Sequence, residues 1–146
     1  MGKPWVILEK LASQKVTEVN RSLNQINLRL AALEQRRSQI LVLIAQNKDR
    51  LNGKKQSCSM AEVQVVTVFL RNLGAALRGT EQEISEVQEE KERLRLDLTE
   101  KLKEKNKMTS LMEREVKKES ERLELIGQKQ LDEAGIRAHN LKKASG

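Results

Sequence analysis

Apolar residues recur in alternating steps of four and three along the stretch from Ala12 to Leu51. Ten of the twelve positions that this alternation selects are apolar, and no Pro or Gly lies within the stretch. A repeat of 3.5 residues keeps one stripe of a helix turned toward a partner helix. The stretch therefore predicts one helix of a coiled coil. Its seam would be formed by Ala12, Val16, Val19, Leu23, Ile26, Leu30, Leu33, Arg37, Ile40, Ile44, Asn47 and Leu51.

The first helix is expected to span about residues 4–51, with a turn at 52–59. Pro4 suits the first turn of a helix, where a backbone N–H has no partner. Asn52 and Gly53 favour a helix end because both tolerate the left-handed conformation.

The second helix is expected to begin at about residue 60. Ser59 is a suitable N-cap, and Glu62 three residues later completes a capping box. The apolar stripe then resumes, and eight of its next ten positions are apolar: Val66, Leu70, Leu73, Leu77, Thr80, Ile84, Val87, Lys91, Leu94 and Leu98. This helix is expected to reach about residue 139, and residues 140–146 to form a frayed tail.

Two glycines fall inside the second helix. The stripe keeps its phase across Gly79-Thr80, which favours a continuous helix at that point. Gly74 and Gly79 each cost about 1 kcal/mol relative to Ala in a helix interior. Their small size is a weak indication that another backbone approaches closely there.

The short turn determines how the two helices pair. A connection of about seven residues is too short for a parallel arrangement, so the helices must fold back on each other. The sequence thus predicts an all-α protein, a single antiparallel coiled-coil hairpin spanning residues 1–146. Pairing Leu51 with Val63 across the turn places Val16 opposite Leu98.

Two irregularities are expected along the seam. Arg37 would face about residue 77, with no acid directly opposite, and such a polar seam residue helps to fix the register. Beyond Leu98 the pattern steps four residues to Leu102, which is a stutter that would locally unwind the supercoil.

The second helix is too long for the first to cover. The cover would end near residue 110 and leave about thirty residues, on the order of 45 Å of helix, without an internal partner. Met112, Val116, Leu123 and Ile126 still form an apolar stripe in this overhang. An apolar stripe without an internal partner indicates an external one.

Composition supports elongated helices over a compact globule. Charged residues make up 34% of the 146 residues and aromatic residues 1%, so a layered core lacks the large rings that usually fill it. Residues 1–55 contain 11 Lys or Arg and 4 Asp or Glu, whereas the remainder contains 17 of each. This basic first helix suggests either an acidic partner or simply solubility.

No catalytic or metal-binding set emerges, so we expect a non-enzyme without cofactors. His139 is the only histidine and Cys58 the only cysteine, which indicates a reducing, cytoplasmic setting. The apolar run from Trp5 to Leu8 is too short to span a membrane, so no membrane insertion is expected. Nucleic-acid binding is disfavoured because Glu104 interrupts the densest basic segment and no base-stacking residues accompany it.

Two segments resemble the FliJ family of the bacterial flagellar type III export apparatus. The first is Phe69-Leu-Arg-Asn-Leu-Gly-Ala-Ala76, just after the turn. The second is Glu121-Arg-Leu-Glu-Leu-Ile-Gly-Gln-Lys-Gln-Leu-Asp-Glu133, followed by Arg137. The resemblance implies a two-helix stalk similar to the gamma subunit of rotary ATP synthases.

The resemblance also implies partners. The chain ends would enter the hexameric export ATPase ring, and the turn would face the membrane-embedded export gate; export chaperones would bind as well. It assigns gate binding to Phe69, Leu73 and Ala76. Binding of the ATPase ring or a chaperone is expected at Met112, Val116, Leu123, Ile126, Gln128, Lys129, Leu131, Asp132 and Arg137. The protein would be cytoplasmic and peripherally associated with the inner-membrane export apparatus.

Two alternatives remain open at this point. The equivalent stalk protein of a virulence-type secretion system would have much the same sequence pattern. A general coiled-coil scaffold is the other alternative, in which the apolar stripe of residues 111–140 would pair with a second copy of the chain.

Overall fold

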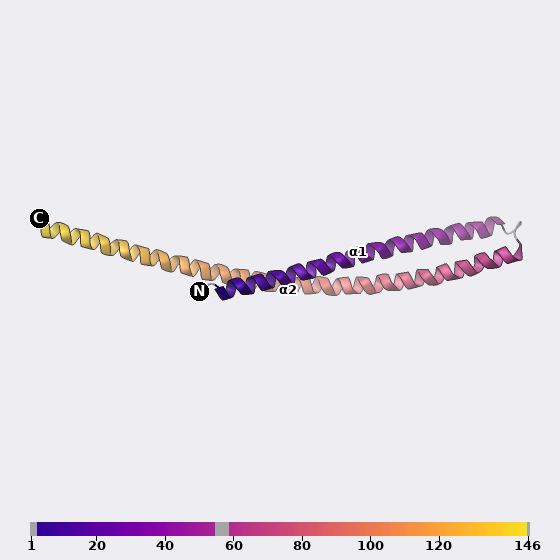
Figure 1. Ribbon diagram of the computed structural model, residues 1–146, viewed down its shortest axis with the longest axis horizontal. Helices are drawn as coiled ribbons and strands as arrows, with labels where there is room; N and C mark the ends of the chain where they lie inside the picture. The colour runs from indigo at the N-terminus through magenta and orange to yellow at the C-terminus, as the bar shows by residue number, and fades with distance from the viewer. Residues whose placement is uncertain (1–2, 55–58, 146) are drawn as a thin grey trace. The chain divides into compact units, whose positions relative to one another are not determined.

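Two long helices make up the part of the chain that the structure describes. The computed structural model describes residues 3–54 and 59–145, and the side chains of residues 4–53 and 59–144. Helix α1 spans Lys3–Lys54 and helix α2 spans Met60–Ser145, with no strand among the described residues (Figure 1). The helices pack against each other, which confirms the predicted all-α hairpin.

Both helices extend beyond their expected ends. Helix α1 continues through Asn52 and Gly53 to Lys54 instead of ending near residue 51, and residues 55–58 of the expected turn lie outside the described part. No glycine in the described ranges has a positive φ, so Gly53 does not form the left-handed cap that the sequence suggests. Helix α2 continues past residue 139 to Ser145, with Lys142 and Lys143 in its last turn, where positive charge complements the helix dipole.

The start of α2 is capped by Ser59. Its side-chain oxygen Oγ accepts a hydrogen bond from the backbone N–H of Glu62 at 3.3 Å. Its carbonyl oxygen accepts another from the backbone N–H of Val63, also at 3.3 Å. The first bond satisfies one of the N–H donors that every helix start leaves open, and the second is the first backbone bond of the helix itself.

The chain divides into two compact units, each containing part of both helices. One unit is Thr17–Thr99, the hairpin proper. Its core is a narrow seam in which Ile26 and Leu33 of α1 pack with Val87 of α2, and partly buried Leu30, Ile84 and Leu94 pack against them. The buried positions of α1 recur every seventh residue, at Val19, Ile26, Leu33, Ile40 and Asn47.

Two polar residues of this seam are satisfied locally. Asn47 is buried, and its side-chain amide donates a hydrogen bond to the carbonyl of Leu43 at 2.7 Å. The sequence predicts no acid directly opposite Arg37, yet the structure pairs Arg37 with Glu81. Its Nε lies 3.3 Å from Oε1 of Glu81. The long Arg side chain reaches four residues along α2 from the expected position 77, so the opposing residue alone does not decide its partner.

The second unit comprises the residues up to Val16 and those from Glu100 onward. The expected stutter at Leu102 is wrong. Leu102 is exposed, whereas Lys101 and Lys105 are half-buried and continue the original heptad from Leu98. Lysine can occupy such positions because its aliphatic stem packs while its ammonium reaches water.

No other backbone lies close to Gly74 or Gly79 in the described chain. A Cβ built on Gly79 would meet nothing within 4 Å, and one on Gly74 would meet only the side chain of Arg78 at 3.6 Å. The suggested close approach is therefore absent within the described chain.

We expect Gly79→Ala to raise the free energy of unfolding by about 1 kcal/mol, because the added methyl group enters open space and the helix loses less backbone entropy on folding. Thermal and urea unfolding followed by circular dichroism measures the change. Ala75→Gly, at an exposed site one turn away on the same helix, is the matched control and should lower stability by a similar amount. A destabilised Gly79→Ala variant would contradict the open surroundings of Gly79.

Candidate functional site

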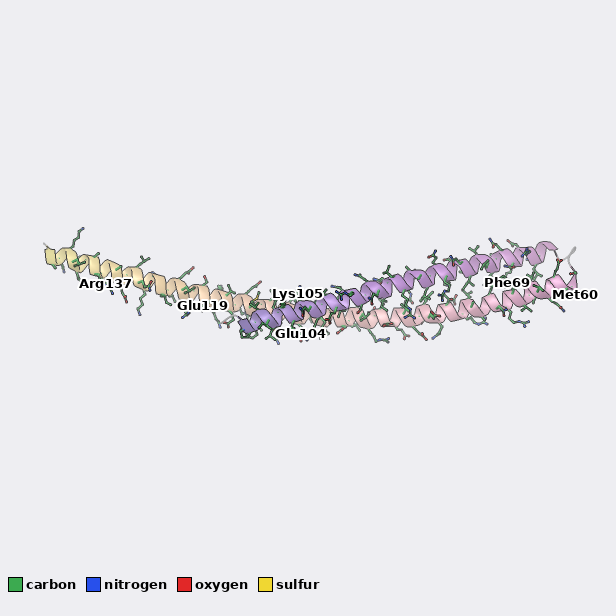
Figure 2. All side chains as sticks on the ribbon, viewed as in Figure 1. Met60, Phe69, Glu104, Lys105, Glu119 and Arg137 are labelled. Carbon is green, nitrogen blue, oxygen red and sulfur yellow. The ribbon has the colours of Figure 1, made fainter. Side chains whose placement is uncertain are left out.

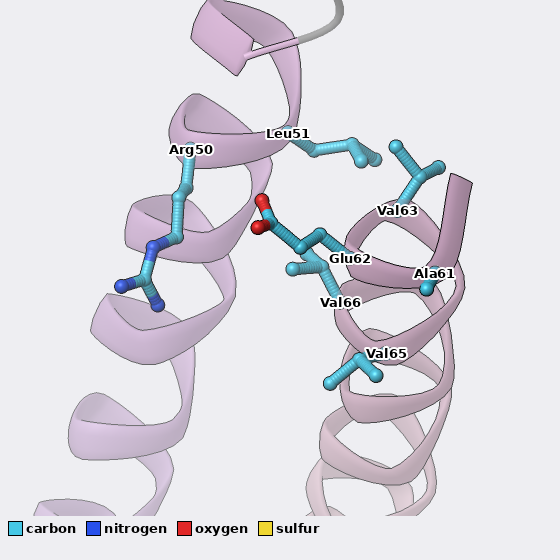
Figure 3. Close-up of a pocket in the computed structure, with 7 residues that line it drawn as sticks. All are labelled: Arg50, Leu51, Ala61, Glu62, Val63, Val65 and Val66. Atoms are coloured by element: carbon cyan, nitrogen blue, oxygen red, sulfur yellow. The ribbon is translucent and has the colours of Figure 1, made fainter. Parts of the chain in front are cut away.

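One side of the hairpin unit has a row of charged positions on each helix. Arg50 of α1 and Glu62 of α2 extend from facing helices and line a groove of about 450 Å³ near the turn (Figure 3). Leu51, Ala61, Val63, Val65 and Val66 complete its lining. This groove shows that Arg50 and Glu62 lie on the same side of the hairpin. Residues that are seven positions apart occupy the same side of a coiled-coil helix, so heptad steps from Arg50 and from Glu62 identify the other residues on that side.

These heptad steps pair basic positions with acidic ones. Arg36 and Arg29 follow Arg50 on α1, and Glu83 and Glu90 follow Glu62 on α2. By spacing, basic positions of the first helix therefore share one side of the hairpin with acidic positions of the second.

In both rows, apolar residues take the positions that follow Arg50 and Glu62. One heptad back from Arg50 is Leu43, and one heptad forward from Glu62 is Phe69, with Ala76 one heptad further. All three side chains are exposed. We call Leu43, Phe69 and Ala76 the flank patch. Figure 2 shows Phe69 on the part of α2 that lies close to Met60 and the turn.

The structure separates the residues expected at the gate-binding site. Phe69 is 43% exposed, whereas Leu73 is 8% exposed and belongs to the seam. Leu73 is therefore not part of the patch surface. Leu43 is a patch residue that the sequence-based selection left out. The heptad step from Arg50 is the signal that finds it.

The second candidate surface is the part of α2 beyond the cover of α1. In the unit that contains it, the last half-buried side chains before this overhang are Leu111, Met112 and Glu115, close to the expected limit at residue 110. From Val116 to Ala144 every described residue is exposed except Gly127, which is half-buried. Figure 2 shows Glu119 and Arg137 on this overhang.

The residues expected to bind a partner on the overhang fall on two faces. At 100° per residue, the apolar residues and Arg137 share one face, and we call its apolar members the tail stripe: Val116, Leu123, Ile126 and Leu131. Gln128, Lys129 and Asp132 point to the opposite face. Met112 lies at the covered end of the stripe. A single partner helix could therefore contact the stripe but not all of the expected residues.

Acidic residues border the start of the tail stripe. A shallow groove of about 670 Å³ follows Met112 and Val116. Its rim is formed by Glu113, Lys117, Ser120, Glu121 and Glu124. The apolar floor with three glutamates around it fits a partner surface that combines apolar and basic groups.

One ion pair stabilises the overhang as a helix. Arg122 donates two hydrogen bonds to the carboxylate of Glu119, from Nη2 at 2.7 Å and from Nε at 3.3 Å. The hydrogen bond from Arg122 lowers the pKa of Glu119, and the same bond raises the pKa of Arg122. The pair bridges one helical turn and therefore favours helix locally.

The described chain offers little for chemistry. Within residues 3–54 and 59–145 no three His, Cys, Asp or Glu side chains are grouped to hold a metal ion. Helix α2 includes one 18-residue window, of mean hydropathy 1.2, that is long and apolar enough to cross a membrane. Only 6% of this window is buried, and one such helix is weak evidence of a membrane span.

Comparison with known proteins gives one match. The family model described as Flagellar FliJ protein matches residues 6–144, nearly the whole chain. No curated protein and no solved structure matches the chain. The family match agrees with the resemblance seen in the two sequence segments, and it favours the flagellar system over the virulence-type alternative.

We expect Phe69→Ala to lower the free energy of unfolding by less than about 1 kcal/mol, because the ring is only partly buried, and Leu73→Ala to lower it by about 2–3 kcal/mol. Chemical denaturation of the two variants measures this difference. Equal losses would show that Phe69 is a seam residue and would remove it from the flank patch.

Proposed function

Because this chain belongs to the flagellar FliJ protein family, we propose that it binds the hexameric export ATPase ring, links the ring to the export gate and escorts export chaperones. The family is a non-catalytic component of the export apparatus, so the chain is a flagellar export-associated stalk protein. The individual partners are the proposal, as is a cytoplasmic location at the inner-membrane export apparatus.

The tail stripe is the observation that supports ring binding best. Four large apolar side chains are exposed on the part of α2 from Val116 onward, where every described residue except Gly127 is exposed up to Ala144. A lone helix with so few apolar contacts is marginal in water. Binding of the stripe to a partner would remove apolar area from water and hold the overhang in place.

The flank patch supports a separate contact with the gate. Leu43 and Phe69 are exposed apolar side chains within otherwise charged rows, and aromatic residues in such settings are frequent anchors of partner binding. The patch lies in the hairpin unit and the tail stripe in the other unit. One chain could therefore bind two partners at once, as a link between ring and gate requires.

The test is the ATP hydrolysis rate of the purified export ATPase, measured with and without the full-length chain. We expect the chain to stimulate hydrolysis. Leu123→Glu should raise the half-saturating concentration about tenfold, because it places a charge in the centre of the contact. Circular dichroism checks that the variant keeps its helix content.

Leu96→Glu is the matched control. Leu96 is on the same helix and is similarly exposed, at 63% compared with 57% for Leu123, but it lies in the hairpin unit. Stimulation by this control should equal that of the unchanged chain. No stimulation and no binding, together with a concentration-dependent dimer through residues 111–140, would contradict the proposal and favour the coiled-coil scaffold.

A further inference from the structure

Near the turn, α2 has apolar residues outside the seam as well as in it. Ala61, Val65, Val68 and Ala75 recur in steps of four, three and seven, so they share one broad face of α2. Val68 and Ala75 are turned away from α1, whereas Ala61 and Val65 lie beside the groove that Arg50 lines. All four are exposed, and Val65 is 69% exposed. We call these four residues the outer face. It is distinct from the seam, and Phe69 lies at its edge.

The surroundings of the outer face are strongly basic. Residues 48–78 contain six Lys or Arg and only two Asp or Glu, a net charge of +4 out of +7 for the whole chain. Lys48 and Arg50 on α1, and Arg71 and Arg78 on α2, are exposed members of this group. A partner for this region should therefore combine an apolar layer with negative charge.

We propose that the outer face and its basic neighbours bind the surface of an anionic lipid bilayer. Val65 and Val68 enter the apolar boundary of the bilayer, while Arg71 and Arg78 of the same helix contact headgroup phosphates. Amphipathic helices with basic flanks bind membranes in this way, and each Lys or Arg near the surface adds to the affinity.

The composition of this stretch favours lying on the membrane over crossing it. The most apolar part of α2 is residues 60–77, and it includes the charged residues Glu62 and Arg71. Charged groups are costly at the bilayer centre but not at its surface. The arrangement with charges around a limited apolar face therefore fits an interfacial contact.

A soluble protein is the other class of partner, and charge favours the lipid. The outer face contains valine and alanine, without the Trp or Tyr that typically anchor protein interfaces. The excess of positive charge around it matches the uniform negative charge of an anionic lipid surface. The inference does not depend on the proposed export function, because it concerns the chain and lipid alone.

The test is co-sedimentation of the purified full-length chain with vesicles of phosphatidylcholine and phosphatidylglycerol, compared with pure phosphatidylcholine. We expect binding to the anionic vesicles that weakens as salt is added. Arg71→Gln with Arg78→Gln should lower the partition coefficient roughly 20- to 30-fold at low salt. Arg21→Gln with Arg93→Gln is the control of equal charge change at exposed sites elsewhere in the hairpin unit, and should lower it only slightly.

The apolar contribution is tested in the same assay. Val65→Gln with Val68→Gln should lower binding about tenfold, whereas Leu28→Gln with Leu96→Gln, at sites that are 74% and 63% exposed, should leave it unchanged. Circular dichroism of each variant confirms an intact fold.

Three results would overturn the inference: equal binding to neutral and anionic vesicles, equal losses in the variants and their controls, or binding that does not depend on Val65 and Val68. Capture of a soluble export protein by Val65 and Val68, without vesicle binding, would assign the outer face to that protein and also overturn it.

Discussion

The seam between α1 and α2 is the constraint on which the rest of the structure depends. Its buried residues recur every seventh position, and their neighbours in the heptad are only half-buried. Within the described chain no large side chain is completely buried. Stability therefore comes from many similar layers, such as that of Ile26, Leu33 and Val87, and not from one central core. A fold of this kind is held in register by its periodicity and leaves most of its surface free for partners.

Spacing alone was enough to predict the hairpin. The heptad of α1, the resumed heptad of α2 and the short turn predict an antiparallel pair, because the turn is too short for the two helices of one chain to run parallel. The overhang followed from comparing the lengths of the helices. These features depend on periodicity, which a single sequence displays directly.

Features that depend on side-chain reach were harder to predict. Leu102 looked like a seam residue because it is apolar, yet Lys101 and Lys105 occupy the seam through their aliphatic stems. Arg37 pairs with Glu81 because its side chain extends along the neighbouring helix. The flank patch was only partly predicted, since Leu43 belongs to it through the pairing of rows, whereas Leu73 is needed in the seam. The residues expected to bind a partner on the overhang all belong to α2, but helical geometry divides them between two faces.

Folding of the hairpin determines which charged residues lie on the same surface. By heptad spacing, basic residues of the first helix share one side of the hairpin with Glu83 and Glu90 of the second. Near the turn the acids are fewer, and the positive charge is available to an external surface. On the overhang, glutamates border the start of the apolar stripe. The chain thus presents chemically different surfaces at the turn and on the overhang.

The central claim is that cover over α2 ends near Glu115 and that the helix beyond it depends on a partner. Amide hydrogen exchange of the isolated chain at low concentration tests this claim most directly. We predict strong protection across residues 17–51 and 60–99, a decline up to residue 115, and rapid exchange from residue 116 onward. Adding the export ATPase should slow exchange in the last region. Protection of residues 116–144 as strong as that of the hairpin, in the dilute chain alone, would contradict the account.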